Sequence, residues 1–317
     1  MTSDSTVPAF GTTMRTGIAL FGRQAGMTTA RRARSHMRTV LITGTSSGIG
    51  QITAKVLVSK GWHVFATMRN LEKKGPLEKS VEEAEGPGRL TFVALDVTDP
   101  ASIEAAVADI LSQTGGTLDA VVHNAGVAIA GAHEDLPDAE IRRVMETNFF
   151  GVLGLTRALL PTFREQRHGR IVCISSQSAF AGQPTNSIYC ASKWALEGWA
   201  ESIAYELDPF GIDVVLVEPG PYKTEIWEAT ERVTPPGGPY TNWVRLVMRG
   251  ADAHAEKHAR DPEEVAQVVA TALETPNPKF RYPVGFFAKL DFFLRGKVPS
   301  RFIRRGTTRY LGIPRTR

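Results

Sequence analysis

The chain has 317 residues, of which 42% are hydrophobic and 22% charged, a composition typical of a globular protein with one large domain. Its formal net charge of +4 is unevenly distributed: residues 1–38 carry +5, residues 279–317 carry +10, and the segment between them carries −11. Because the body is acidic and only the two ends are basic, the charge pattern argues against a nucleic-acid partner.

Cysteine content and apolar runs bear on where the protein resides. The two cysteines, Cys173 and Cys190, show neither metal-ligand spacing nor a disulfide framework, so we expect no metal site and a cytoplasmic protein. No stretch reaches the roughly eighteen apolar residues that a membrane-spanning helix needs. Residues 1–36 are rich in arginine and poor in acids, which predicts a disordered extension before a functional start at Met37; an organelle transit peptide is the alternative.

From Met37 onward, short apolar runs alternate with amphipathic stretches. The apolar runs predict six strands, at residues 38–43, 63–67, 90–95, 118–123, 170–175 and 213–217. The stretches predict helices from the first turn to about residue 60 and at 101–111, 138–150, 186–207 and 262–273. Continuously apolar strands are typical of a sheet covered on both faces. The alternation therefore predicts an α/β fold, a single doubly wound parallel sheet of Rossmann type over residues 37–317 with helices on both faces.

Two segments near the C-terminus depart from this rhythm. Residues 221–260 contain a proline- and glycine-rich run at 235–239, and they predict an irregular substrate lid beyond the carboxyl end of a late strand. Residues 279–317 form a basic tail in which aromatic residues alternate with lysine and arginine. Those aromatics either pack on the core or on another subunit, or they contact an anionic membrane surface.

A glycine-rich segment with the sequence TGTSSGIG follows the first predicted strand and opens the first helix. Glycines let the backbone approach a pyrophosphate, and a helix N-terminus offers free N–H groups. The spacing differs from the common G-x-G-x-x-G pattern, and a tight turn without a ligand is the alternative. The candidate cofactor-binding residues in this segment are Gly44, Ser46, Ser47, Gly48, Ile49 and Gly50.

The second strand ends without the acidic residue that would bind the adenosine 2′-hydroxyl of NAD(H). Arg69 stands there instead, and its guanidinium can bind a 2′-phosphate, so we predict NADP(H) in preference to NAD(H). The alternative for Arg69 is an arginine in solvent at a strand end. Asp96 and Val97 follow the third strand, where the carboxylate could meet the adenine amino group or lie near the next helix N-terminus.

The spacing of Tyr189 and Lys193 gives the clearest indication of chemistry. Positions four apart on a helix share a face, so the phenol and the ammonium project together. A nearby cation and a positively charged nicotinamide would favour the phenolate over a free tyrosine, whose pKa is about 10. Ser176, at the end of the fifth strand, adds a hydroxyl thirteen residues before the tyrosine.

Together these residues resemble the short-chain dehydrogenase/reductase family. The match covers about residues 38–275 and consists of the glycine-rich segment, Asn124-Ala125-Gly126 after the fourth strand, Asn148, Ser176, Tyr189, Lys193 and Pro219-Gly220. The resemblance implies that Tyr189 is the catalytic acid/base, that Ser176 hydrogen-bonds the reacting oxygen and that Lys193 lowers the tyrosine pKa and holds the nicotinamide ribose. It also implies that Asn148 holds a water of a proton relay. Asn124, Ala125, Gly126, Pro219, Gly220 and Thr224 are expected at the cofactor.

A narrower similarity to the 17-beta-hydroxysteroid dehydrogenase and retinol dehydrogenase-like branch rests on residues 189–198, 209–211, 281–285 and 288–290. It implies a hydrophobic alcohol or carbonyl substrate of steroid, retinoid or long-chain type. As in relatives, helices at 100–115, 145–167 or 186–207 could form contacts in a homo-oligomer. The alternative function is a non-catalytic NADP(H)-sensing regulator, which would have an eroded active site, whereas all four predicted catalytic residues are present.

Overall fold

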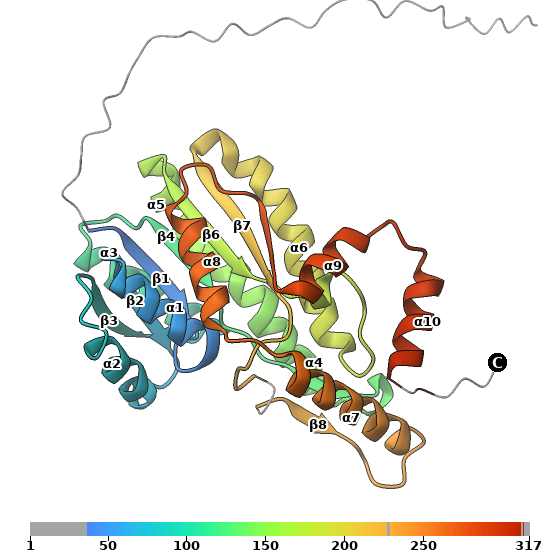
Figure 1. The fold of residues 1–317 in the computed structure, drawn as a ribbon. Helices are drawn as coiled ribbons and strands as arrows, with labels where there is room; N and C mark the ends of the chain where they lie inside the picture. The colour runs from blue at the N-terminus through green and yellow to red at the C-terminus, as the bar shows by residue number, and fades with distance from the viewer. Residues whose placement is uncertain (1–36, 227–228, 312, 314–317) are drawn as a thin grey trace, which may run out of the picture. The chain divides into compact units, whose positions relative to one another are not determined.

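The computed structural model describes residues 37–226, 229–311 and 313. A seven-stranded, wholly parallel sheet in the order β3-β2-β1-β4-β6-β7-β9 forms the centre of the domain (Figure 1). Its strands are β1 (Thr39–Thr43), β2 (His63–Met68), β3 (Arg89–Ala94), β4 (Ala120–His123), β6 (Gly169–Ile174), β7 (Ile212–Pro219) and β9 (Arg281–Val284). The predicted Rossmann-type sheet is therefore confirmed, and its chain order reverses between β1 and β4.

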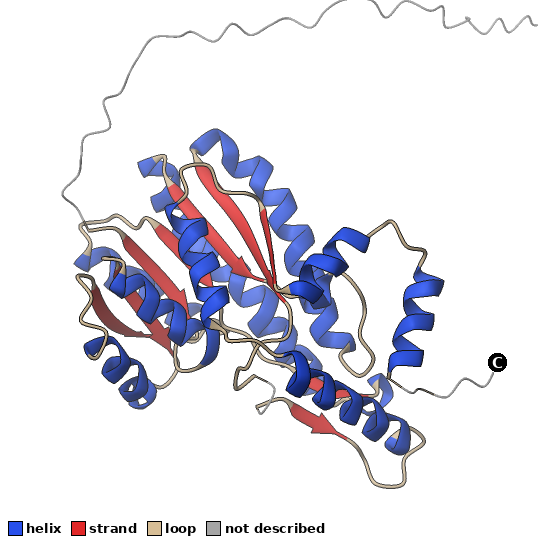
Figure 2. Cartoon of the chain, in the orientation of Figure 1, coloured by secondary structure: helices blue, strands red, loops and turns tan. Residues whose placement is uncertain are grey.

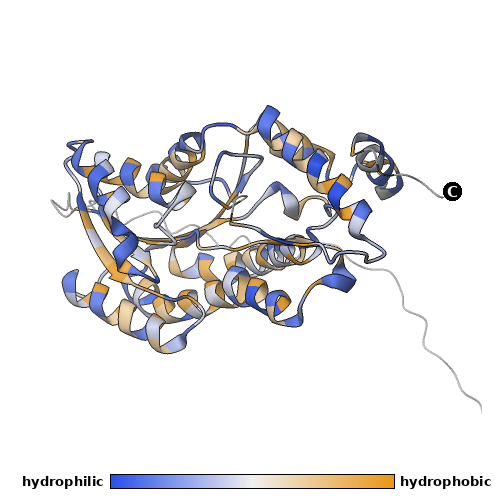
Figure 3. Ribbon diagram, turned by 90° about the horizontal axis from the view of Figure 1, so that it is seen from below, coloured by the Kyte–Doolittle hydropathy of each residue, from blue (hydrophilic) through white to orange (hydrophobic). Residues whose placement is uncertain are grey.

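Helices cover both faces of the sheet, as Figure 2 shows. They are α1 (Gly48–Ser59), α2 (Gly75–Glu82), α3 (Pro100–Gln113), α4 (Asp138–Met145), α5 (Gly151–Gln166), α6 (Ser187–Leu207) and α8 (Glu263–Glu274). Successive residues of β1 serve opposite faces: Val40 and Ile42 pack with α1 and α8, whereas Leu41 packs with α3, α5 and α6. The inner strands β1, β2, β4 and β6 are buried along their whole length because both of their faces are covered, whereas the edge strands β3 and β9 are only partly buried. The surrounding helices carry both hydrophobic and hydrophilic residues (Figure 3).

The edge strand β9 is absent from the six predicted strands. Its sequence contains Pro283, which has no N–H to donate to a neighbouring strand and argues against a central strand. The structure places the segment at the edge, where it pairs with β7 alone, so one side of β9 needs no hydrogen-bonding partner. A second, two-stranded parallel sheet of β5 (Ile129–Gly131) and β8 (Glu231–Val233) was likewise too short to predict.

The predicted lid at residues 221–260 is more regular than expected. Besides β8 it contains α7 (Thr241–His258), an amphipathic helix that buries Val244 and Val247. Figure 1 shows β8 and α7 beyond the carboxyl ends of the sheet strands. The lid segment therefore lies at the edge of the sheet where parallel α/β folds bind their ligands.

The basic tail folds into β9, α9 (Phe286–Leu294) and α10 (Ser300–Tyr310). Phe287 packs on His254 and His258 of α7, and the ring of Phe292 contacts Phe180 although Phe292 stays partly exposed. Phe286, Phe293 and Phe302 are more exposed. Within the described ranges, every helix is too short or too polar to span a bilayer.

Candidate active site

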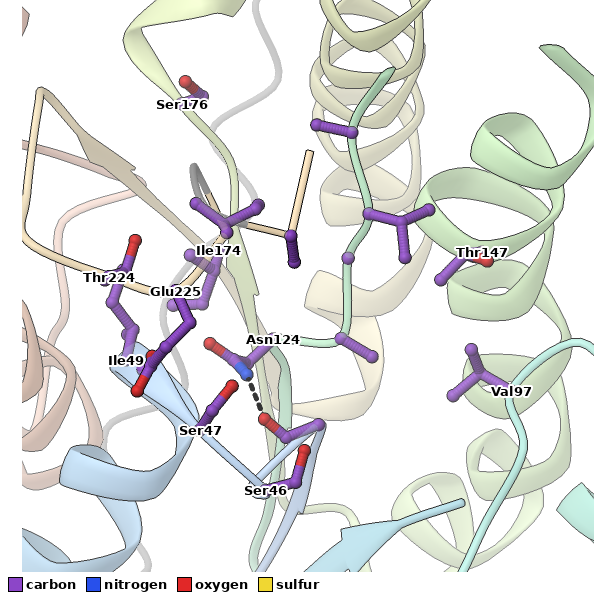
Figure 4. A pocket seen from close by; sticks show the side chains of 18 of the residues that line it. Ser46, Ser47, Ile49, Val97, Asn124, Thr147, Ile174, Ser176, Thr224 and Glu225 are labelled. Carbon is purple, nitrogen blue, oxygen red and sulfur yellow. Dashed lines mark hydrogen bonds between the residues drawn. The ribbon is translucent and has the colours of Figure 1, made fainter. Parts of the chain in front are cut away.

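A cavity of about 320 Å³ opens at the carboxyl ends of the sheet strands and is lined by residues that follow β1, β2, β3, β4, β6 and β7. Figure 4 shows several of the lining side chains. Nearly all of the predicted site residues line it. They are Gly44, Ser46, Ser47, Gly48, Ile49, Arg69, Asp96, Val97, Asn124, Ala125, Gly126, Ser176, Tyr189, Lys193, Pro219, Gly220 and Thr224. Gly50 and Asn148 are the two predicted residues outside this lining, and each has another position in the structure.

The turn after β1 depends on glycine at three places. Gly44 and Gly48 adopt left-handed φ angles of 68° and 57°, a conformation that strains other residues. A Cβ on Gly44 would also lie 2.8 Å from the Cα of Ala125. Gly50 has a different role, because a Cβ there would come within 2.3 Å of the Gly44 carbonyl oxygen and of the Asn124 amide nitrogen. Gly50 therefore lets α1 pack on the turn instead of facing the cavity.

Asn124 ties this turn to the end of β4. Its Nδ2 donates to the carbonyl oxygens of Thr43 and Gly44, both at 2.9 Å, and the bond to Gly44 is drawn in Figure 4. The Thr43 hydroxyl in turn accepts from the backbone N–H groups of Asn124 and Ala125. These bonds fix two neighbouring strand ends against each other, which keeps the backbone that faces the cavity in one conformation.

The two charged residues predicted at the adenosine end differ in their surroundings. Arg69 is exposed, and among the described residues it forms no ion pair, so its guanidinium is available to a ligand. Asp96 is held by Thr98, whose backbone N–H and hydroxyl both donate to Oδ1, at 2.9 and 2.7 Å. This Asx turn leads into α3 and orients Asp96 at the cavity wall.

Ser176, Tyr189 and Lys193 meet at the opposite end of the cavity. Lys193 Nζ donates to the carbonyl oxygen of Ile174 at 2.8 Å and lies 5.7 Å from the centre of the Tyr189 ring. The Ser176 hydroxyl caps a short 3₁₀ turn: it accepts from the Ser178 N–H and donates to the Ser178 hydroxyl, each at 3.1 Å. The predicted spacing thus brings a phenol, a hydroxyl and an ammonium to one wall.

Asn148 lies behind this wall and is almost fully buried, at 1% exposure. The sequence predicted one helix over residues 138–150, but α4 ends in a π-helical turn at Glu146–Phe150 before α5 begins. The Asn148 amide exchanges two hydrogen bonds of 2.9 Å with the backbone of Val127 and donates to the Ser192 hydroxyl at 3.0 Å. It therefore joins the segment after β4 to α6, the helix that carries Tyr189 and Lys193. π-turns often occur at functional sites.

Burial has the largest effect on the pKa values of Tyr189 and Lys193, which form with Ser176 the predicted catalytic wall of the cavity. It raises the pKa of Tyr189 to about 12, against a smaller opposite effect of the Ser176 hydroxyl. Burial also lowers the pKa of Lys193 to about 8, opposed by Cys173 and Glu197. The expected lowering of the tyrosine pKa is therefore not provided by the protein groups around Tyr189. Desolvation of the phenolate outweighs any nearby charge in the described chain.

Comparison with known proteins identifies the family. The model of the short chain dehydrogenase family matches residues 38–234 of this chain. The chain belongs to this family. It is accordingly an NAD(P)-dependent dehydrogenase, and nothing in the comparisons supports a non-catalytic regulator.

Three relatives are similar over most of the dehydrogenase. It is 38% identical to retinol dehydrogenase 8 of Bos taurus over 254 residues, 77% of this chain and 80% of that protein. It is 37% identical to 17-beta-hydroxysteroid dehydrogenase type 1 of Homo sapiens over 253 residues, 77% and 76% of the two chains. Identity to the 3-ketodihydrosphingosine reductase of Bacteroides thetaiotaomicron is 34% over 255 residues, 80% and 90% of the two chains.

Solved structures share the fold of this short-chain dehydrogenase. A short-chain dehydrogenase from Streptomyces avermitilis matches with a TM-score of 0.71 and 33% identity, over 88% of this chain and 97% of that chain. A metagenomic short-chain oxidoreductase in complex with NADP gives 0.62 and 27%, over 78% and 96%. The 3-ketoacyl-(acyl-carrier-protein) reductase of Brucella melitensis complexed with NADH gives 0.63 and 26%, over 75% and 91%.

Several residues that line the cavity of the dehydrogenase were not predicted. Arg143 and Thr147 come from α4 and the π-turn, and Glu225, Ile226 and Ala229 come from the lid segment. Thr147 lies in the π-turn, which the periodicity of a single α-helix does not predict, and Arg143 lies on α4 in no recognised motif. The lid residues follow no motif; the break in rhythm after Pro219 predicted only that this segment is irregular and lies beyond the end of a late strand.

Proposed function

We propose that this dehydrogenase transfers hydride between NADP(H) and a hydrophobic alcohol or carbonyl compound of steroid, retinoid or long-chain type. The observation that carries the proposal is the shared cavity. The glycine turn at Gly44 and Gly48 forms one end, and Ser176, Tyr189 and Lys193 form the other. An extended dinucleotide could bind along this line with its reactive end beside the tyrosine.

The proposed roles follow from the chemistry of each side chain. Tyr189 keeps its proton at neutral pH, because burial raises its pKa to about 12, so it suits proton donation to a carbonyl oxygen. Ser176 hydrogen-bonds the same oxygen as negative charge develops there. Lys193 binds the nicotinamide ribose. Asn148 orders the segment beside them and contacts a water that connects Lys193 with solvent.

The hydrogen-bond donors that line the cavity suit the phosphate groups of NADP(H). The N-terminus of α1 at Ser47 and Gly48 lines the cavity, and we place the pyrophosphate beside its free backbone N–H groups. Arg69 supplies the cation for a 2′-phosphate, which supports NADP(H) over NAD(H). The nicotinamide ring, when bound, supplies or accepts the hydride. The named structural relatives are divided, since one holds NADP and another NADH.

Two observations support a hydrophobic substrate. The names of relatives refer to a retinol, a steroid and a long-chain sphingoid ketone. Beside the catalytic wall, the cavity is lined by the apolar residues Val127, Ala128 and Ile226. Apolar walls of this kind favour substrates with large apolar surfaces. Pro219-Gly220 at the end of β7 and Thr224 at the start of the lid line the cavity, and we place the carboxamide of the nicotinamide beside them.

The test begins with NADPH and NADH binding to the purified full chain, followed by nicotinamide fluorescence, and continues with NADPH oxidation against a panel of hydrophobic ketones and aldehydes. We expect Tyr189→Phe to lower kcat by about a hundredfold or more while NADPH affinity changes little. Tyr205→Phe, on the exposed side of the same helix, is the control and retains activity. Near-normal turnover by Tyr189→Phe would refute the acid/base assignment. NADPH binding without turnover of any carbonyl would favour the sensing alternative.

We also propose peripheral contact of the tail with an anionic membrane surface. On α9, Phe286, Leu290 and Phe293 are exposed at spacings of four and three residues, so they share one helical face. Exposed Lys289 and Lys297 flank that face. The exposed arginines of α10 are Arg301, Arg304, Arg305 and Arg309, and no acidic residue follows Asp291. Exposed aromatics beside a cationic helix match the interface of an anionic bilayer.

We also propose that the chain forms a homo-oligomer through the helices that the sequence analysis named for subunit contacts. Phe150, at the start of α5, and Tyr205, on α6, are exposed by 49% and 83%. Exposed large aromatic side chains on these helices are available for contact with a second copy of the chain. The mass of the purified chain in solution would decide between a monomer and an oligomer.

A further inference from the structure

A group of buried charges lies directly behind the catalytic wall. Glu197 of α6 and Glu218 of β7 have side-chain exposures of 2% and 0%, and Arg281 of β9 is 12% exposed. The guanidinium of Arg281 forms ion pairs with both carboxylates, to Glu218 at 2.9 Å. Its other nitrogen binds Glu201 at the protein surface, at 2.6 Å. Buried charges are costly unless they are paired, so this arrangement needs a specific reason.

Glu197 connects this group to the active site at two points. Its Oε1 accepts a hydrogen bond of 2.5 Å from the hydroxyl of Ser175, the residue before Ser176. It also lies four residues after Lys193 on α6, so the two side chains share a helical face. Lys193 itself binds the carbonyl oxygen of Ile174. The end of β6 is thus held from one face of α6 by an ammonium and a carboxylate.

Glu218 is the carboxyl group of this cluster whose pKa is strongly raised. Burial, and secondly the charge of Glu197, raise the pKa of Glu218 to about 8, against the opposing effect of Arg281. Glu218 is therefore mostly protonated near neutral pH, and its Oε2 has no hydrogen-bonding partner among the described residues. Arg281 and Glu197 remain as an ion pair, with Arg295 4.0 Å from the same carboxylate.

Lys193 faces three titratable groups in the described chain. Cys173 on β6 and Tyr189 on α6 are both neutral near pH 7, since burial raises the pKa of each to about 12. Cys173 and, to a smaller extent, Glu197 oppose the effect of burial on the pKa of Lys193. A buried ammonium keeps its proton more readily when a carboxylate is close.

We propose that Glu197, held in place by Arg281, is a positioning residue that fixes the Ser175–Ser176 strand end and stabilises the charge of Lys193. The proposal rests on the proposed function for its effect on turnover. Arg281 lies beyond residues 38–234, which match the family pattern, so the C-terminal strand takes part in the active site through this contact.

The decisive variant is Glu197→Gln, which keeps the shape and an acceptor oxygen but removes the charge. Glu201→Gln is the matched control, because it also binds Arg281 but lies on the exposed side of α6. The titration of Lys193 is followed by ¹³C NMR of lysine-labelled full chain and assigned with Lys193→Arg. We expect the midpoint for Lys193 to fall by about one pH unit in Glu197→Gln and to stay unchanged in the control.

Turnover gives the second readout. In Glu197→Gln we expect kcat to fall about tenfold with NADPH affinity nearly unchanged, and the alkaline limb of its pH profile to move to lower pH. Ser175→Ala, a milder change, lowers kcat without moving the Lys193 titration. Wild-type behaviour of folded Glu197→Gln in both readouts overturns the proposal. If the wild-type chain turns over no carbonyl, the proposed function fails, and the Lys193 titration still decides the role of Glu197.

Discussion

Arg69 is the residue on which cofactor choice depends in our proposal. It lines the cavity from the end of β2, it is exposed, and no described acidic residue pairs with it. We predict that Arg69→Ala weakens NADPH binding by about tenfold to a hundredfold, because a charge-assisted hydrogen bond to a phosphate contributes roughly 1.5–3 kcal/mol. NADH, which lacks the 2′-phosphate, binds with nearly unchanged affinity. Equilibrium fluorescence of the nicotinamide measures both.

A lysine close by provides the control for this experiment. Lys73, in the short 3₁₀ turn after β2, carries the same charge but does not line the cavity. Lys73→Ala should therefore leave the ratio of the two affinities unchanged. Equal losses of NADPH and NADH affinity in Arg69→Ala would show that Arg69 does not bind the 2′-phosphate.

At the scale of single residues, the sequence predicted which side chains lie together but did not predict how burial changes their pKa values. The spacing of Tyr189 and Lys193 placed both on one face of a helix, and the structure brings them to the same wall as Ser176. Spacing carries no information on desolvation, so the raised pKa of Tyr189 was not foreseen. The contact between Glu197 and Ser175 joins residues 22 positions apart, and it depends on how α6 packs on β6.

At the scale of elements, the packing of α1 on the turn after β1 depends on Gly50. We predict that Gly50→Ala destabilises the fold by about 2 kcal/mol or more, because its Cβ would meet the Gly44 carbonyl and the Asn124 amide at 2.3 Å. Thermal and chemical unfolding measure the loss. We expect NADPH affinity to fall as well, because the clash would displace Gly44 and Asn124, which line the cavity.

The control for this prediction is a glycine in the interior of another helix. Gly198 in α6 has no atom within 4 Å of a built Cβ, so alanine there is free of clashes. Gly198→Ala should leave stability unchanged or raise it by about 0.5–1 kcal/mol. If Gly50→Ala were as stable as Gly198→Ala, the close packing of α1 on the turn would be wrong.

The elements that could be predicted are those with strong local patterns. Six strands were found from continuous apolar runs because helices cover both faces of the sheet. β9 and the π-turn escaped prediction for physical reasons. Pro283 is tolerated in β9 only because the strand is at an edge, and the π-turn around Asn148 is fixed by tertiary hydrogen bonds to Val127 and Ser192.

At the scale of the whole molecule, charge separates the two ends of the chain from its body. Residues 279–317 carry a net charge of +10. Their cationic side chains do not all have the same surroundings. Arg281 is directed inward to two buried carboxylates, whereas the arginines of α10 remain exposed. A basic tail read from composition alone cannot distinguish the inward cation from the exposed ones, because that distinction depends on β9 joining the sheet.

The exposed part of the tail gives the last prediction. The full chain should co-sediment with vesicles of phosphatidylcholine containing phosphatidylserine, but much less with phosphatidylcholine alone, and the binding should weaken with salt. In a variant with both Phe286→Ser and Phe293→Ser, two side chains exposed by 66% and 62% lose their apolar area, and we expect vesicle affinity to fall about tenfold or more. Tyr205→Ser removes an exposed aromatic from α6, away from the cationic tail, and should bind like the wild type. Equal binding by all three proteins, or none by the wild type at low salt, would exclude α9 as a membrane-contacting face and leave its exposed aromatics for another subunit.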